Sequence, residues 1–176
     1  MRTARTLNFL LLLLLFVGSG LAWPHLPERI PVHFGAGGEV DRWSDTTLVS
    51  WFALPVIAVL LILFVHGTVR FAARHPKWLN VPDKDNFLRL PPEHRRIVVQ
   101  TLKESLEPTL LHLTLLFCVI QYAIYRAALG SDPKPYMAAV LALAVLGTPI
   151  AILTIHRRVA EEIERQVSIA RREGKF

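Results

Sequence analysis

Cysteine is almost absent from this chain, because Cys118 is the single one among 176 residues. An intrachain disulfide is therefore excluded, and any loop must keep its shape by other means. Cys118 itself lies in an apolar run, where we expect it to pack as a small hydrophobic residue. The sequence also has no HExxH or CxxC motif and no local nucleophile signature. We therefore expect no enzyme activity, no catalytic residue, no cofactor and no metal.

Signatures of phosphate and nucleic-acid binding are missing as well. The glycines of the GAGG segment at residues 35–38 are followed by no Lys-Ser or Lys-Thr pair, and Val40 occupies the third glycine position of a GxGxxG pattern. The net charge is +6 and the isoelectric point is near 10.0, but the basic residues flank apolar runs. Because they do not form one face with interleaved aromatics, we expect no nucleic-acid partner.

Apolar sequence is abundant, since hydrophobic residues make up 52% of the chain and its mean hydropathy is +0.38. These values are too high for an ordinary soluble domain. Four apolar stretches approach the roughly 20 residues with which a helix crosses a bilayer; they cover residues 7–23, 49–69, 109–125 and 137–155. The sequence thus predicts an all-α integral membrane protein with four transmembrane helices.

Basic residues are distributed unevenly around these stretches. Two precede the first stretch, eight lie within residues 70–103 and six within residues 157–175, while four lie on the other side, at Arg29, Arg42, Arg126 and Lys134. Cytoplasmic segments carry the excess of Lys and Arg, so the split of 16 to 4 predicts cytoplasmic N- and C-termini in a multi-pass protein of the bacterial inner membrane. Residues 24–48 then form an extracytoplasmic loop.

Aromatic residues support the same orientation, because amphipathic rings favour the headgroup zone. Five of them fall at the expected outer ends of the stretches, at Trp23, Trp51, Tyr122, Tyr125 and Tyr136. An alternative stays open for the first stretch, where two early arginines, a leucine run and small residues at positions 20 and 22 also fit a cleaved signal peptide. Cleavage would leave three spans.

The inner segments contain helical patterns of their own. Pro91 and Pro92 mark a helix start, and Ile97, Val98, Leu102 and Leu106 can share one apolar face. This pattern predicts an interfacial amphipathic helix before the third span, with Pro108 bending or restarting it. The C-terminal tail has an apolar side that comprises Val159, Ile163, Val167 and Ala170. This pattern suggests either a solvated helical extension or docking to a partner or the inner leaflet. Within the tail, Glu161 can pair with Arg165.

The outer loop contains the most constrained segment, LPERIPVHFGAGG at residues 26–38. Prolines restrict its backbone, glycines permit a turn, and the alternation of Ile30, Val32 and Phe34 predicts a short extended or hairpin element. The run LPERIPVHFGAGGEVDRWSD resembles the N-terminal domain of unknown function of SdpI-like bacterial membrane proteins, whose pattern is close to LPxxIPxHF, then a glycine, then an acidic residue and a Trp or Gly. The matching positions are Leu26, Pro27, Ile30, Pro31, His33, Phe34, Gly38, Asp41 and Trp43.

The resemblance covers roughly the first 70 residues and divides the chain. Residues 1–72 form an SdpI-like N-terminal domain, 73–108 a basic cytoplasmic connection, 109–157 a transmembrane hairpin and 158–176 a cytoplasmic helical tail. The best-known relative is a membrane immunity protein that protects against a secreted toxin and relays its presence to a regulator. The resemblance therefore implies sensing, immunity or an accessory role in signal transduction, although residues beyond about 70 do not obviously match that protein.

Candidate site residues fall into two groups. In the loop we expect ligand or partner binding by Pro27, Pro31, His33, Phe34, Gly38, Asp41 and Trp43. His33 could hydrogen-bond the loop backbone or act in metal or proton sensing with a nearby acid, at Glu39, Asp41 or Asp45. Within the apolar stretches, three polar side chains are costly in lipid and are expected to face the bundle, one another or water at a boundary: His66, His112 and Gln121.

Two functions follow from these groups. The first is a non-catalytic inner-membrane protein whose outer loop receives an extracytoplasmic peptide or membrane protein partner, besides its contact with the lipid bilayer. The alternative is a small transporter or transporter subunit, acting as a homo-oligomer with a polar path through His66, His112 and Gln121.

Overall fold

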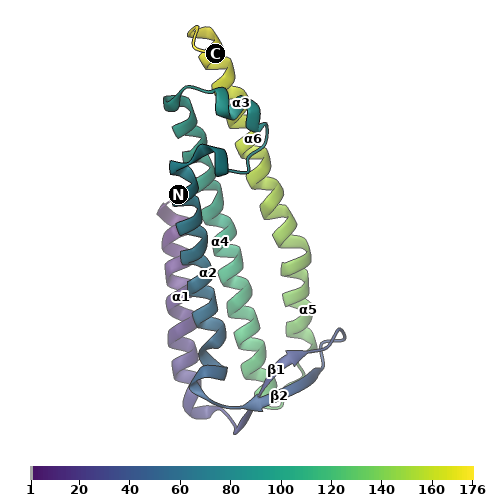
Figure 1. Ribbon diagram of the computed structural model, residues 1–176. Coiled ribbons are helices and arrows are strands. Elements are labelled where there is room, and N and C mark those ends of the chain that lie inside the picture. The colour runs from purple at the N-terminus through teal and green to yellow at the C-terminus, as the bar shows by residue number, and fades with distance from the viewer. Residues whose placement is uncertain (1) are drawn as a thin grey trace.

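The computed structural model describes residues 2–176 and is mostly helical (Figure 1). Its long helices run alternately up and down, and a two-stranded sheet crosses one end of the bundle. We call this end the hairpin end, and the opposite end, where both termini lie, the terminal end. The elements are α1 (Arg2–Ala22), η1 (Trp23–His25), β1 (Arg29–Phe34), β2 (Val40–Asp45), α2 (Leu48–Arg74), η2 (Pro76–Trp78), α3 (Lys84–Arg89), α4 (Pro92–Ala128), α5 (Lys134–Ala142), the π-helical η3 (Leu143–Gly147) and α6 (Thr148–Arg172).

Four helical segments of the described chain are long and apolar enough to cross a membrane. They are Thr3–His25, Leu48–Arg74, Pro92–Ala128 and Lys134–Arg172, each of which contains one of the stretches identified in the sequence. The prediction of a mostly helical chain with four helices able to cross a membrane is confirmed. The segments exceed the apolar stretches because their polar ends continue as helix beyond the bilayer thickness.

Helix α4 is the centre of the bundle, since it contacts α1, α2, α5 and α6. Polar contacts recur along its parallel pairing with α1. Thr114 Oγ1 donates to Asn8 Oδ1 over 2.5 Å in a buried site, and Cys118 Sγ lies 3.8 Å from the Leu11 carbonyl oxygen. Polar contacts of this kind hold helices together in lipid, where apolar surface alone provides little driving force.

The two strands form an antiparallel hairpin, which confirms the element expected from the alternating pattern. Ile30 and Pro31 are buried, and β1 packs on α4. The turn is closed by a hydrogen bond from Gly35 N to Glu39 O of 2.8 Å, and Gly38 has the left-handed φ of 82°. The hairpin therefore reaches from the α1–α2 side of the bundle to the start of α5 (Figure 1).

Gly38→Ala is expected to lower the free energy of unfolding by about 1–2 kcal/mol, because a non-glycine residue is strained at this φ. An added Cβ would also lie 3.3 Å from Lys134 Cα and Met137 Cβ. Gly37→Ala is the matched control, since its Cβ would meet the flexible carboxylate of Glu39. Thermal unfolding in detergent measures both variants, and equal midpoints would contradict the role given to Gly38.

The terminal end contains a compact apolar core outside the main bundle. Phe87 and Leu90 from the segment around α3 pack with buried residues of α4 and α6; these are Val98, Val99, Val159, Ile163, Val167 and Ala170. The structure thus changes two expectations. Val98, assigned to an interfacial face, is buried within the protein, and the apolar side of the tail docks onto the chain itself instead of being solvated or bound to a partner or leaflet.

Polar groups complete this terminal core. His94 is buried, with Nδ1 2.7 Å from Gln166 Oε1 and Nε2 3.3 Å from Glu173 Oε2. Hydrogen bonds from Lys175 and then His94 hold the pKa of the Glu173 carboxyl below its ordinary value. Earlier in the tail, Arg165 pairs with Glu162 at 2.9 Å, so the expected pairing of Arg165 with Glu161 is wrong. The reason is that the three-residue spacing brings Glu162 equally near on the helix surface.

The fourth span differs from the others in its backbone and its packing. Residues of η3 form a π-helical stretch directly before Thr148 and Pro149. At the last residue of η3, Gly147, there is no room for a Cβ because the His112 ring occupies that space. Pro108 does not restart the helix, since α4 continues through it from Pro92 to Ala128.

Candidate functional site

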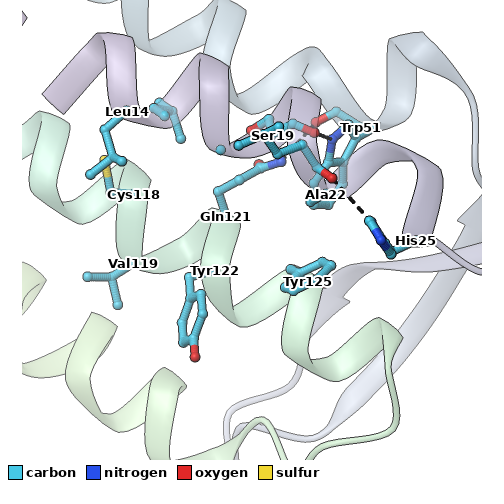
Figure 2. Close-up of a pocket in the computed structure, with 13 residues that line it drawn as sticks. Leu14, Ser19, Ala22, His25, Trp51, Cys118, Val119, Gln121, Tyr122 and Tyr125 are labelled. Carbon is cyan, nitrogen blue, oxygen red and sulfur yellow. Dashed lines mark hydrogen bonds between the residues drawn. The ribbon is translucent and has the colours of Figure 1, made fainter. Parts of the chain in front are cut away.

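A cavity of about 620 Å³ lies at the hairpin end between α1, α2 and α4 (Figure 2). Its walls are mostly apolar, and the aromatic rings of Trp51, Tyr122 and Tyr125 lie along them. His25 lines it from η1, with Nδ1 3.2 Å from the Leu21 carbonyl oxygen. Large apolar cavities with a few convergent polar groups are the usual form of small-molecule sites.

Trp51 organises one wall of this cavity and joins three helices. Thr47 and Ser50 form a reciprocal capping box that begins α2 and sets Trp51 on its first turn. The Trp51 indole Nε1 donates to the Ser19 carbonyl oxygen on α1 over 2.9 Å. Gln121 Nε2 on α4 donates to the Trp51 carbonyl oxygen over 3.1 Å. Trp51 is buried, so the expectation that its ring belongs to the headgroup belt is replaced by a packing role.

Two polar atoms at this cavity have no hydrogen-bond partner within the described part of the chain. They are Ser19 Oγ and Gln121 Oε1, and both are buried. Both residues line the cavity, where Figure 2 shows Ser19 on α1 and Gln121 on α4. A buried polar atom without a partner costs free energy, so a ligand that supplies the missing hydrogen bonds is favoured. The amide oxygen of Gln121 can accept only, which requires a donor on the ligand.

The loop residues singled out in the sequence lie on the hairpin, away from the cavity walls. His33 Nδ1 is 2.6 Å from Asp41 Oδ1, so His33 pairs with an exposed acid instead of the loop backbone. Trp43 is exposed on β2, Pro27 is exposed before β1, and Phe34 is half-buried at the end of β1. Pro31 and Gly38 are buried and shape the hairpin. No cluster of three metal-ligating side chains occurs among residues 2–176.

The three intramembrane polar residues lie in separate places. Gln121 lines the cavity at the hairpin end, whereas His66 faces a different pocket at the terminal end. His112 Nε2 lies 3.4 Å from Thr148 Oγ1, between α4 and the fourth span. The structure therefore brings none of the three together.

Sequence reasoning missed two residues that the structure makes prominent. Ser19 lies in a Gly-Ser-Gly segment of an apolar run, which was a usable signal, but its role depends on which helix lies beside it. Glu107 directly precedes Pro108, and its charge alone suggests an exposed position, whereas its carboxylate is buried against α1 and α2. Neither neighbour can be found from spacing along one helix.

Comparison with known proteins identifies one domain and one relative over nearly the whole chain. Residues 10–59 match the family described as "Domain of unknown function (DUF1648)", a stretch that includes Ser19, the hairpin and Trp51. An "Uncharacterized protein" of Archaeoglobus fulgidus is 30% identical over 166 residues, which cover 92% of this chain and 90% of that protein. No solved structure matches the chain.

Proposed function

We propose that this chain, which belongs to the same family as the Archaeoglobus fulgidus protein and carries a DUF1648 domain, is a non-catalytic membrane receptor for an amphipathic ligand. The cavity at the hairpin end is the binding site. The single observation that carries the proposal is the pair of buried, unpartnered atoms, Ser19 Oγ and Gln121 Oε1, at an otherwise apolar cavity of about 620 Å³. This combination suits an apolar chain that ends in a hydrogen-bond donor.

The proposed orientation places the hairpin end outside the cell. The excess of basic residues near the terminal end supports cytoplasmic termini in the inner membrane, with the hairpin extracytoplasmic. A ligand or partner arriving from outside would then meet the exposed His33, Asp41 and Trp43 on the hairpin. The resemblance to SdpI-like proteins supports sensing, immunity or an accessory role in a membrane complex as the consequence of binding, through an extracytoplasmic peptide or membrane protein.

The transporter alternative lacks a supporting observation. It requires His66, His112 and Gln121 along one polar path, but Gln121 and His66 line different pockets, and His112 packs at the fourth span. The cavity therefore favours binding over passage.

A brominated long-chain alcohol is a suitable probe of the cavity, because bromine quenches a nearby indole. In a variant whose other three tryptophans are replaced by phenylalanine, the alcohol is expected to quench Trp51 at a lower concentration than its methyl ether. Both probes have the same chain, but only the alcohol has a donor for Gln121 Oε1. Removal of that bond in Gln121→Leu is expected to weaken alcohol binding roughly tenfold and to leave ether binding nearly unchanged.

Gln100→Leu is the matched control, since Gln100 is exposed on the same helix and lies outside the cavity. It is expected to bind both probes as the parent does. The proposal fails if the alcohol and the ether quench Trp51 equally, or if Gln121→Leu and Gln100→Leu behave alike.

A further inference from the structure

A second pocket, of about 400 Å³, lies at the terminal end between α1, α2 and α4, separate from the cavity described above. Its polar residues are Arg5, His66, Arg70, Lys103 and Glu107. Three permanent cations thus surround one carboxylate. Basic pockets between transmembrane helices at a membrane surface suit the head groups of phospholipids.

The carboxylate of Glu107 is buried at this pocket, and only one of its two oxygens has a hydrogen-bond partner among the described residues. Glu107 Oε1 accepts from Arg5 Nε at 3.1 Å and from the Arg5 guanidinium Nη2 at 2.5 Å, and it lies 3.5 Å from His66 Nε2. Glu107 Oε2 has no hydrogen-bond partner within residues 2–176 and is buried. A buried carboxylate oxygen without a hydrogen bond costs free energy, so binding of a ligand that carries an N–H or O–H donor is favoured.

Two of the cations are available for an anion. Arg70 and Lys103 are exposed, and neither takes part in an ion pair within the part of the chain that the structure describes. They lie on α2 and α4, so they approach the pocket from two helices. Arg5 contributes a third positive charge from α1, although its guanidinium also holds Glu107.

The pocket has a polarity gradient along the bundle. On α2, Leu63 lies deeper toward the hairpin end than His66 and Arg70, because α2 runs toward the terminal end. On α4, which runs the other way, Leu110 lies deeper than Lys103. Leu110 is buried in the bundle, whereas Leu63 is exposed, so apolar surface on α2 lies below the surface cations. This order matches the head group and acyl chain of a lipid, whereas a free phosphate would use the surface part alone.

We propose that this pocket binds a membrane phospholipid whose phosphate pairs with Arg70 and Lys103 and whose head group donates a hydrogen bond to Glu107 Oε2. The donor is an ammonium N–H or a hydroxyl, and the acyl chain lies along the exposed side chain of Leu63. The site is thus specific for head groups that combine a phosphate with a donor. Nothing in this assignment depends on the ligand of the hairpin-end cavity.

Thermal unfolding of the detergent-solubilised full chain, with added lipid, tests the assignment. Phosphatidylethanolamine and phosphatidylcholine are both zwitterionic, but only phosphatidylethanolamine has ammonium N–H groups. We expect phosphatidylethanolamine and phosphatidylglycerol to raise the unfolding midpoint more than phosphatidylcholine at equal concentration. Glycerol 3-phosphate, which has the phosphate and hydroxyls without acyl chains, is expected to give no comparable shift.

Charge-matched variants locate the effect. Each removed cation is expected to weaken phosphatidylglycerol binding about five-fold, so Arg70→Gln with Lys103→Gln loses most of the shift. Arg74→Gln with Arg96→Gln removes the same charge from exposed positions outside the pocket and should keep the shift. The assignment is overturned if both double variants respond alike, if phosphatidylcholine matches phosphatidylethanolamine, or if glycerol 3-phosphate matches phosphatidylglycerol.

Discussion

Trp51→Ala is expected to lower the free energy of unfolding by about 3–5 kcal/mol, the cost of emptying a buried tryptophan site. The Trp51 side chain is fully enclosed, with the residue only 2% exposed, and its indole bond to the Ser19 carbonyl joins α2 to α1. Removal of the ring would leave that carbonyl without its donor and enlarge the neighbouring cavity. Thermal unfolding in detergent, followed through retention of monodisperse protein, measures the loss.

Trp78→Ala is the matched control for this prediction. It makes the same chemical change at a residue that is 73% exposed, so little packing is lost. Trp51→Phe separates the two contributions, because it keeps an aromatic ring and removes the hydrogen bond, for an expected cost of about 1 kcal/mol. Midpoints for Trp51→Ala and Trp78→Ala within a degree of each other would contradict the bridging role of Trp51.

Phe87→Ala is expected to release the C-terminal half of α6 from the terminal core. Phe87 is completely buried, and it packs in one cluster with Val98 of α4 and Ile163 of α6. Truncation of a buried phenylalanine lowers stability by about 3–5 kcal/mol. Because this core is small, we expect the loss to appear as local opening of the core and not as unfolding of the whole chain. Limited trypsin digestion, read as the rate of cleavage within residues 157–172, is expected to accelerate more than tenfold.

Phe64→Ala provides the comparison, since Phe64 is 70% exposed on α2 and lies outside this core. Its tryptic rate in the tail is expected to equal that of the unaltered chain. A Phe87→Ala protein whose tail is cleaved no faster than the Phe64→Ala protein would show that the tail does not depend on the terminal core.

The hairpin and the tail show how far pattern reasoning extends. Alternation of Ile30, Val32 and Phe34 before the glycines predicted a short extended or hairpin element, because a strand period and a turn are properties of adjacent residues. The structure shows that it is a hairpin. The spacing of Val159, Ile163 and Val167 correctly indicated an apolar helix side. The same spacing could not tell whether water, lipid, a partner or this chain covers that side, because periodicity carries no information about the neighbour.

The binding sites follow the same division. Gln121 could be singled out because an amide in an apolar stretch is costly in lipid wherever the helix lies. The importance of Ser19 and Glu107 could not be found in this way. Each acquires it from a helix distant in the chain: Ser19 from Trp51, which bonds its carbonyl, and Glu107 from Arg5.

Local properties of the chain were therefore sufficient for the four membrane-crossing helices, since the length and polarity of each apolar run decide whether a segment crosses a bilayer. Tertiary structure alone decided that α4 is central and that α1 runs parallel to it. It also decided that two pockets lie at opposite ends, with Ser19 Oγ and Gln121 Oε1 at one and Glu107 Oε2 at the other, each without a hydrogen-bond partner among residues 2–176. The physical reason is that a cavity or a buried ion pair belongs to the space between helices. That space depends on which helices pack together, and four similar apolar helices could pack in several different arrangements.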